Sequence, residues 1–150
     1  MPVPYDADFA RWGAEQADAL RSGRLDALDR EHLAEEIEGL VRSDKRALAS
    51  QIERLVLHLL KWRYQLLLRS VSWQRSIIQA RTEIADLLAD SPSLEREVAT
   101  SVERRYRAAR AGAIVETGMP LATFPKVCPF AMGEILDDAG MGETEDLDNA

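Results

Sequence analysis

The chain of 150 residues has one cysteine, few glycines and prolines, and no long apolar run. Because Cys128 stands alone, no disulfide can form within the chain and no thiolate metal cluster can be built from one copy. With 8 glycines, 6 prolines and 46% hydrophobic residues, the composition is that of a packed globular protein. No apolar stretch approaches the length of a membrane span, about 18 residues, and the sequence does not begin with basic residues followed by an apolar run. We therefore expect one domain over residues 1–138, in the cytoplasm and away from the membrane.

Charge is distributed unevenly along the sequence. The chain as a whole carries a formal charge of -7, whereas residues 42–81 contain nine basic and two acidic residues. Such polarity predicts either a basic face for an anionic partner or packing of this segment against acidic parts of the same protein. We favour the second interpretation.

Apolar residues recur at spacings of three or four along most of the chain, which predicts an all-α helical bundle. The expected elements are four main helices, the second unusually long, followed by a short C-terminal helix and a flexible acidic tail. They cover residues 6–22, 29–68, 71–89, 92–117, 129–137 and 139–150. Ser91 is the expected N-cap of the fourth helix, with Pro92 at its first position.

The long second helix needs a partner for its apolar face, since length alone does not stabilise a helix in water. Gly39 and residues 42–45 are the expected places for a bend. The leucines at 66–68 are expected to be exposed, and with the length of the helix they suggest a homodimer.

Four aromatic residues occupy the apolar stripes and are expected in the core, namely Trp12, Trp62, Trp73 and Tyr106. Residues 58–73 hold two of the tryptophans together with a histidine and three basic residues, so this stretch invites a functional interpretation. We interpret it as the hinge between two helices, with the arginines covering the edges of the rings.

Paired acidic residues raise the possibility of a metal site. Glu35 and Glu38 form E-x-x-E, and Glu83 and Asp86 form E-x-x-D on the next helix, which is similar to the Mg²⁺-binding pairs of the all-α nucleotide pyrophosphohydrolases. Against this stand the long intervening segment and the lack of a matching Lys or Asn signature. His32 shares the face of the first pair, but His58 lies about 39 Å further along a continuous helix, too far for one metal.

A nucleic-acid interface is the second alternative. Residues 42–81 interleave arginines with Trp62, Tyr64 and Trp73, which could contact phosphates and bases. The tryptophans lie on apolar stripes, however, and the protein is acidic overall, so we do not expect nucleic acid as a partner.

Catalytic residues are not indicated. His58 has leucines on both sides, which favours a half-buried imidazole bonded to a carboxylate or to a carbonyl on another helix. No nucleophile, phosphate-binding loop or dinucleotide-binding motif accompanies it.

Several short motifs follow one another in a fixed order along the chain. These are "YDADFARW", "LDREHLAEEIEGL", "LLKWRYQ", "SWQRSI", "DSPSLE" and "FPKVCPF" followed by "EILDD". In this order the sequence resembles the bacterial family called domain of unknown function 29 over about residues 5–138. The resemblance implies a mainly helical protein with no assigned activity, cofactor or catalytic residue. One departure is "LLLRS" after "KWRYQ", where family members often have proline and polar residues.

The sequence therefore predicts a non-enzymatic helical protein that self-associates or binds an unidentified protein partner, with no cofactor and no catalytic residue. The alternatives are a Mg²⁺-dependent phosphoanhydride hydrolase using Glu35, Glu38, Glu83 and Asp86, and a nucleic-acid-binding protein acting through residues 42–81.

Overall fold

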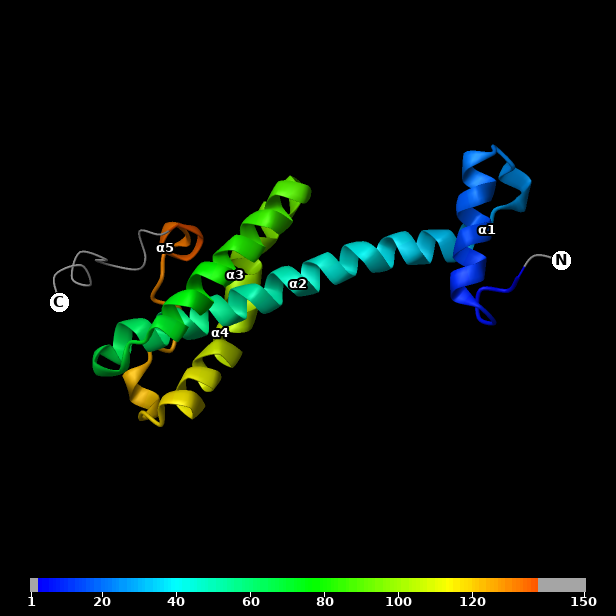
Figure 1. The fold of residues 1–150 in the computed structure, drawn as a ribbon. Helices are drawn as coiled ribbons and strands as arrows, with labels where there is room; N and C mark the ends of the chain where they lie inside the picture. The colour runs from blue at the N-terminus through cyan, green and yellow to red at the C-terminus, as the bar shows by residue number, and fades with distance from the viewer. Residues whose placement is uncertain (1–2, 138–150) are drawn as a thin grey trace. The chain divides into compact units, whose positions relative to one another are not determined.

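The computed structural model describes residues 3–137 and consists of helices joined by turns and, over residues 118–131, by a longer segment (Figure 1). Within this range the helices are α1 (Phe9–Arg21), α2 (Arg30–Tyr64), α3 (Val71–Asp90), α4 (Glu95–Thr117) and α5 (Met132–Leu136). Short 3₁₀ turns cover η1 (Leu25–Ala27), η2 (Leu66–Leu68), η3 (Pro92–Leu94) and η4 (Leu121–Thr123). The predicted all-α fold, with four long helices and a short fifth, is confirmed. The described residues include no helix long and apolar enough to cross a membrane.

The chain divides into two compact units, and the boundary along the sequence falls between Ser43 and Asp44. The division falls inside α2, in the segment where the sequence predicted a bend, although every residue from Arg30 to Tyr64 is helical. Since α2 belongs to both units, a single domain over residues 1–138 stays a prediction. The predicted tail at 139–150 lies outside the described residues.

The first unit contains α1, η1 and the first turns of α2. Asp8 caps α1, because its side chain accepts a hydrogen bond from the backbone N–H of Arg11 at 3.0 Å. The helix is followed by Gly23, whose φ of 72° is readily adopted only without a Cβ. Trp12, Gln16 and Ala19 form the buried face of α1.

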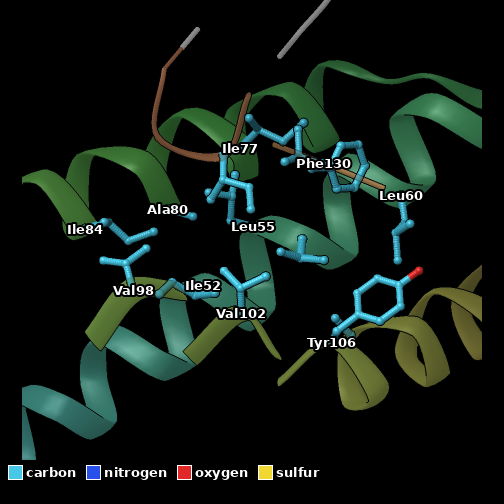
Figure 2. Close-up of a cluster of buried hydrophobic side chains, with 14 of the residues drawn as sticks. Ile52, Leu55, Leu60, Ile77, Ala80, Ile84, Val98, Val102, Tyr106 and Phe130 are labelled. Atoms are coloured by element: carbon cyan, nitrogen blue, oxygen red, sulfur yellow. The ribbon is translucent and has the colours of Figure 1, made fainter. Parts of the chain in front are cut away.

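The core of the second unit is formed by α2, α3 and α4 together with the C-terminal segment. Ile52, Ile84 and Val98 come from three different helices and point toward one another in Figure 2. On α4 the buried residues are Val98, Val102, Tyr106, Ala109 and Ala113, which follow the spacing of one helix face and include the predicted core residue Tyr106. Phe124, Phe130 and Ile135 complete this core from the segment after α4.

Several helix boundaries differ from the sequence prediction. α1 begins at Phe9 rather than at residue 6, and α5 begins at Met132 rather than at residue 129. The second helix ends at Tyr64 rather than near residue 68, because Gln65 leaves helical geometry and the exposed leucines that follow have no core to hold them. The α-helical part of the fourth helix begins at Glu95, since Pro92–Leu94 form a 3₁₀ turn and the Ser91 side chain makes no capping bond.

Candidate functional site

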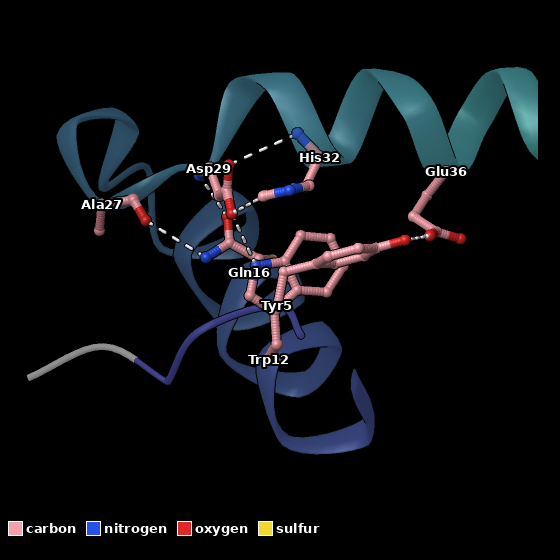
Figure 3. A network of polar contacts seen from close by, with 7 residues as sticks. All are labelled: Tyr5, Trp12, Gln16, Ala27, Asp29, His32 and Glu36. Atoms are coloured by element: carbon pink, nitrogen blue, oxygen red, sulfur yellow. Dashed lines mark hydrogen bonds and ion pairs between the residues drawn. The ribbon is translucent and has the colours of Figure 1, made fainter. Parts of the chain in front are cut away.

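A network of polar contacts joins the segments of the first unit around Asp29, which immediately precedes α2 (Figure 3). The indole N–H of Trp12 donates to Asp29 Oδ2 at 3.1 Å, and His32 Nδ1 lies 2.7 Å from the same oxygen. The backbone N–H of Asp29 donates to Gln16 Oε1 at 2.7 Å, and Gln16 Nε2 donates to the carbonyl of Ala27 at 3.4 Å. These bonds fix η1 and the start of α2 against α1.

Asp29 and His32 stabilise each other's charged forms. The hydrogen bond to His32 lowers the pKa of the Asp29 carboxyl, and the same bond raises the pKa of the His32 imidazole. A carboxylate that orients an imidazole is also part of many catalytic sites. Here the pair is also tied to Trp12, so its evident effect is to hold the unit together.

Tyr5 covers the other side of this imidazole. The rings of Tyr5 and His32 are stacked, with centroids 4.1 Å apart and an angle of 10° between their planes. The Tyr5 hydroxyl donates to the Glu36 carboxylate, and this bond is the main reason that the pKa of Tyr5 rises to about 12. Tyr5 therefore remains a protonated donor at physiological pH and ties the segment before α1 to α2.

A cavity of about 550 Å³ lies beside this network, with Pro4, Trp12, Gln16 and Asp29 among its lining residues. Sequence reasoning singled out Trp12 and His32 but missed Tyr5 and Asp29. The available signal was the acidic residue three positions before His32, at the point where the apolar period of α2 begins.

The four carboxylates of the predicted magnesium site belong to two different units. Glu35 and Glu38 are exposed on α2 in the first unit, and Glu38 lies 3.9 Å from Arg42 in an ion pair. Glu83 and Asp86 are exposed on α3 in the second unit. Within residues 3–137, no three His, Cys, Asp or Glu side chains are grouped as metal ligands. The magnesium site stays a prediction.

His58 is half-buried on α2, and its Nδ1 lies 2.8 Å from the carbonyl of Arg54. That carbonyl belongs to its own helix, not to another helix as the sequence suggested. Burial lowers the pKa of His58 and so favours the neutral imidazole, and Nδ1 donates to the carbonyl because a carbonyl oxygen can only accept.

The aromatic and basic residues of the predicted hinge contact one another. Trp62 is 8% exposed, and Arg69 lies over its ring at 4.6 Å while donating to the Trp62 carbonyl at 2.8 Å. The ammonium of Lys61 lies 4.5 Å from the ring centroid of the half-buried Trp73. These cations cover ring faces on which a ligand would stack.

Several basic residues of the 42–81 segment also pair with acidic residues elsewhere in the second unit. Lys61 Nζ lies 2.7 Å from Glu116, and Arg63 lies 3.0 Å from Glu134. Lys45 lies 3.4 Å from Glu97. These pairs are the complementary packing that the charge distribution favoured.

The exposed apolar side chains include two groups whose members are close together in sequence. On the first half of α2, Ile37, Leu40 and Val41 are 62%, 68% and 48% exposed. At η2, Leu66, Leu67 and Leu68 are 61%, 98% and 60% exposed. Exposed apolar groups that lie together commonly mark binding surfaces.

Comparison with known proteins identifies the family. Residues 4–139 match the family model described as "Domain of unknown function DUF29", as the sequence motifs suggested. No curated protein and no solved structure gives a significant match to the chain. Because the family model covers most of the sequence, the chain belongs to the DUF29 family.

Proposed function

We propose that this protein is a non-enzymatic helical interaction protein that self-associates in the bacterial cytoplasm. The observation that carries the proposal is the α2 stripe, defined as Leu33, Ile37, Leu40 and Val41. These residues follow the spacing of one helix face, yet Ile37 and Leu40 are more than half exposed.

The physical argument is the cost of leaving this face in water. A helix as long as α2 is stabilised mainly by packing of its apolar face, because helix propensity alone gives only marginal stability. Each large apolar side chain removed from water contributes about 1.5 to 3 kcal/mol. A second helix on the stripe would supply this burial, and another copy of the chain carries a matching stripe.

The test is the mass of the full chain in solution, measured by light scattering over a range of concentrations. A mass of twice the 16.8 kDa of one chain supports the proposal, whereas that of a single chain at every concentration refutes it. Matched variants identify the surface: I37E/L40E alters the α2 stripe, and L66E/L67E alters the leucines of η2. We expect I37E/L40E to be monomeric and L66E/L67E to remain associated.

A further inference from the structure

The second unit exposes a group of apolar side chains at the turn where α2 ends and α3 begins (Figure 1). We define it as the η2 tip, which consists of Leu66, Leu67, Leu68 and Val71. Their side chains are 61%, 98%, 60% and 80% exposed. The value for Leu67 is close to that of a completely free side chain, so the folded unit leaves this apolar group in water.

The three leucines of the tip point in different directions. A 3₁₀ turn has three residues per turn, so consecutive side chains project about 120° apart. Since all three are nonetheless mostly exposed, solvent reaches the turn from several sides. A rigid protein surface would cover one side and leave at least one leucine in water. The fluid apolar region of a lipid bilayer can surround the whole turn.

The charges of the sequence around the tip are basic. Residues 54–82 include no aspartate or glutamate. Lys61 and Arg63 already pair with carboxylates from elsewhere in the second unit. Arg69 and Arg75 are exposed, and in the described part of the chain neither forms an ion pair with a carboxylate. The tip therefore combines apolar side chains with two positive charges that no described carboxylate compensates.

We propose that the η2 tip binds the surface of a bilayer rich in anionic lipid. Its leucines enter the boundary between headgroups and acyl chains, and Arg69 and Arg75 contact the headgroup phosphates. Insertion of this kind is shallow, about 5–10 Å, and needs no membrane-spanning helix. The inference goes beyond the proposed self-association and does not depend on it. It replaces the expectation of a chain away from the membrane, because the sequence alone did not show which arginines lack a carboxylate partner.

The backbone of the turn suits shallow insertion. The backbone N–H groups of Leu68 and Arg69 donate to the carbonyls of Gln65 and Leu66 at 3.2 and 3.4 Å. Backbone groups that are paired within the turn cost less to move out of water than unpaired ones. At the depth of the headgroups, water still reaches the remaining polar groups of the turn.

A second copy of the chain fits the tip less well than anionic lipid does. An isologous contact sets the same surface of both copies together, so it would bring Arg69 and Arg75 of one copy toward the same two residues of the other. Like charges at close quarters destabilise such a contact. Lipid phosphates have the opposite charge, and a basic residue near an anionic membrane surface is attracted to it.

The experiment measures co-sedimentation of the full chain with vesicles made from an equal mixture of phosphatidylglycerol and phosphatidylcholine, and with vesicles of phosphatidylcholine alone. We expect binding to the anionic vesicles that weakens as the salt concentration rises, and much weaker binding to the neutral ones. R75Q removes one of the two charges and should weaken binding to the anionic vesicles by about fivefold. R96Q is the matched control, because Arg96 is exposed and follows η3 at the other end of α3. It should bind as the wild type does.

Substitutions of the leucines test the apolar part of the contact without changing the charge. L66S/L67S should weaken binding to the anionic vesicles by about tenfold or more, because two side chains no longer gain from leaving water. L66M/L67M is the matched control, since methionine keeps the apolar character but changes the shape of the side chain. A fluid apolar region accepts this change, so L66M/L67M should bind nearly as the wild type does. Circular dichroism of each variant checks that the helices remain folded.

Insertion has a separate readout in a C128S background, where no native thiol remains. A fluorophore that is sensitive to polarity, attached at L67C, should shift its emission to shorter wavelength when anionic vesicles are added. The same fluorophore at S93C, in η3 at the other end of α3, should not shift.

Three results would overturn the proposal. If the chain does not bind the anionic vesicles, the tip is not a membrane element, and a change in the solution mass of L66S/L67S would then make it a contact between copies. Binding that L66S/L67S leaves unchanged would be adsorption by charge without insertion. Equal binding to neutral and anionic vesicles would refute the role of the two arginines. Self-association is measured without lipid, so its failure and the failure of membrane binding are distinguished.

Discussion

Tyr5 and His32 lie face to face with ring centroids 4.1 Å apart, although Tyr5 precedes the first helix and His32 belongs to the second. On its edge the same imidazole bonds to Asp29. Two segments that are separate in sequence therefore meet at one titratable ring. This ring gives the first unit a property that can be measured directly.

The two histidines of the chain should titrate on opposite sides of the ordinary imidazole pKa of about 6.5. The bond to Asp29 raises the pKa of His32, whereas burial lowers that of His58. Two-dimensional NMR of the imidazole protons over pH 4–9 resolves both. D29N should lower the pKa of His32 and leave His58 unchanged, and coincident titration of the two rings would contradict the assignment.

The stability of the first unit should depend on pH through the same pair. Folding raises the pKa of His32, so protonated His32 stabilises the folded unit. This contribution is fully present at pH values below the unfolded pKa of 6.5, and it is lost as the pH rises through the folded pKa. Asp29, whose pKa is lowered from 3.8, loses its contribution at the acid end as pH falls through its folded pKa. Hydrogen exchange of residues 9–36, corrected for the intrinsic pH dependence, should show weaker protection above the folded pKa of His32. In H32Q this step should vanish.

Trp62 should contribute more to stability than Trp73. Trp62 is 8% exposed beneath Arg69, whereas Trp73 is only half-buried. We expect W62A to lower the free energy of unfolding by about 3 to 5 kcal/mol, as for other core truncations, and W73A by less. Urea unfolding of the two variants gives the comparison, and an equal or larger loss for W73A would contradict this ranking by burial.

The fold could be predicted from the sequence wherever an apolar period faces a core. On α4 the apolar residues at the spacing of one helix face, from Val98 to Ala113, are buried, because that face is packed against the core. On α2 the same period continues over residues that the structure leaves exposed, such as Ile37 and Leu40. Periodicity shows which side chains share a face, but not whether another element covers it.

The polar network was only partly predictable, because its partners come from turns and caps. Tyr5 meets His32 and Glu36 only after the chain turns through α1 and η1, and no repeating pattern encodes that path. Local chemistry was more informative. The spacing of Asp29 and His32 suits a carboxylate that caps the start of α2. Asp29 Oδ1 accepts a weak hydrogen bond from the backbone N–H of His32 at 3.4 Å.

The last prediction concerns the attachment of α5 to the core of the second unit. Arg81 is buried on α3, and its guanidinium donates to the carbonyls of Ile135 at 3.1 Å and Glu134 at 2.6 Å. These carbonyls belong to the last turn of a five-residue helix, whose carbonyl groups have no partner within the helix. A cation at this end also interacts favourably with the helix dipole.

R81M keeps much of the apolar stem but removes both bonds and leaves the two carbonyls without these donors. We expect a loss of about 2 to 4 kcal/mol in the free energy of unfolding and faster hydrogen exchange at residues 132–136. R63M is the matched control, because Arg63 reaches the same short helix through the partly exposed Glu134 side chain at 3.0 Å and lies over the ring of Phe130, at 4.5 Å from its centroid. It should cost no more than about 1 kcal/mol. The two arginines contact the same helix and differ mainly in burial and in the backbone carbonyls that they reach. If R63M released α5 as strongly as R81M, the surface ion pair rather than the buried guanidinium would hold α5 on the core.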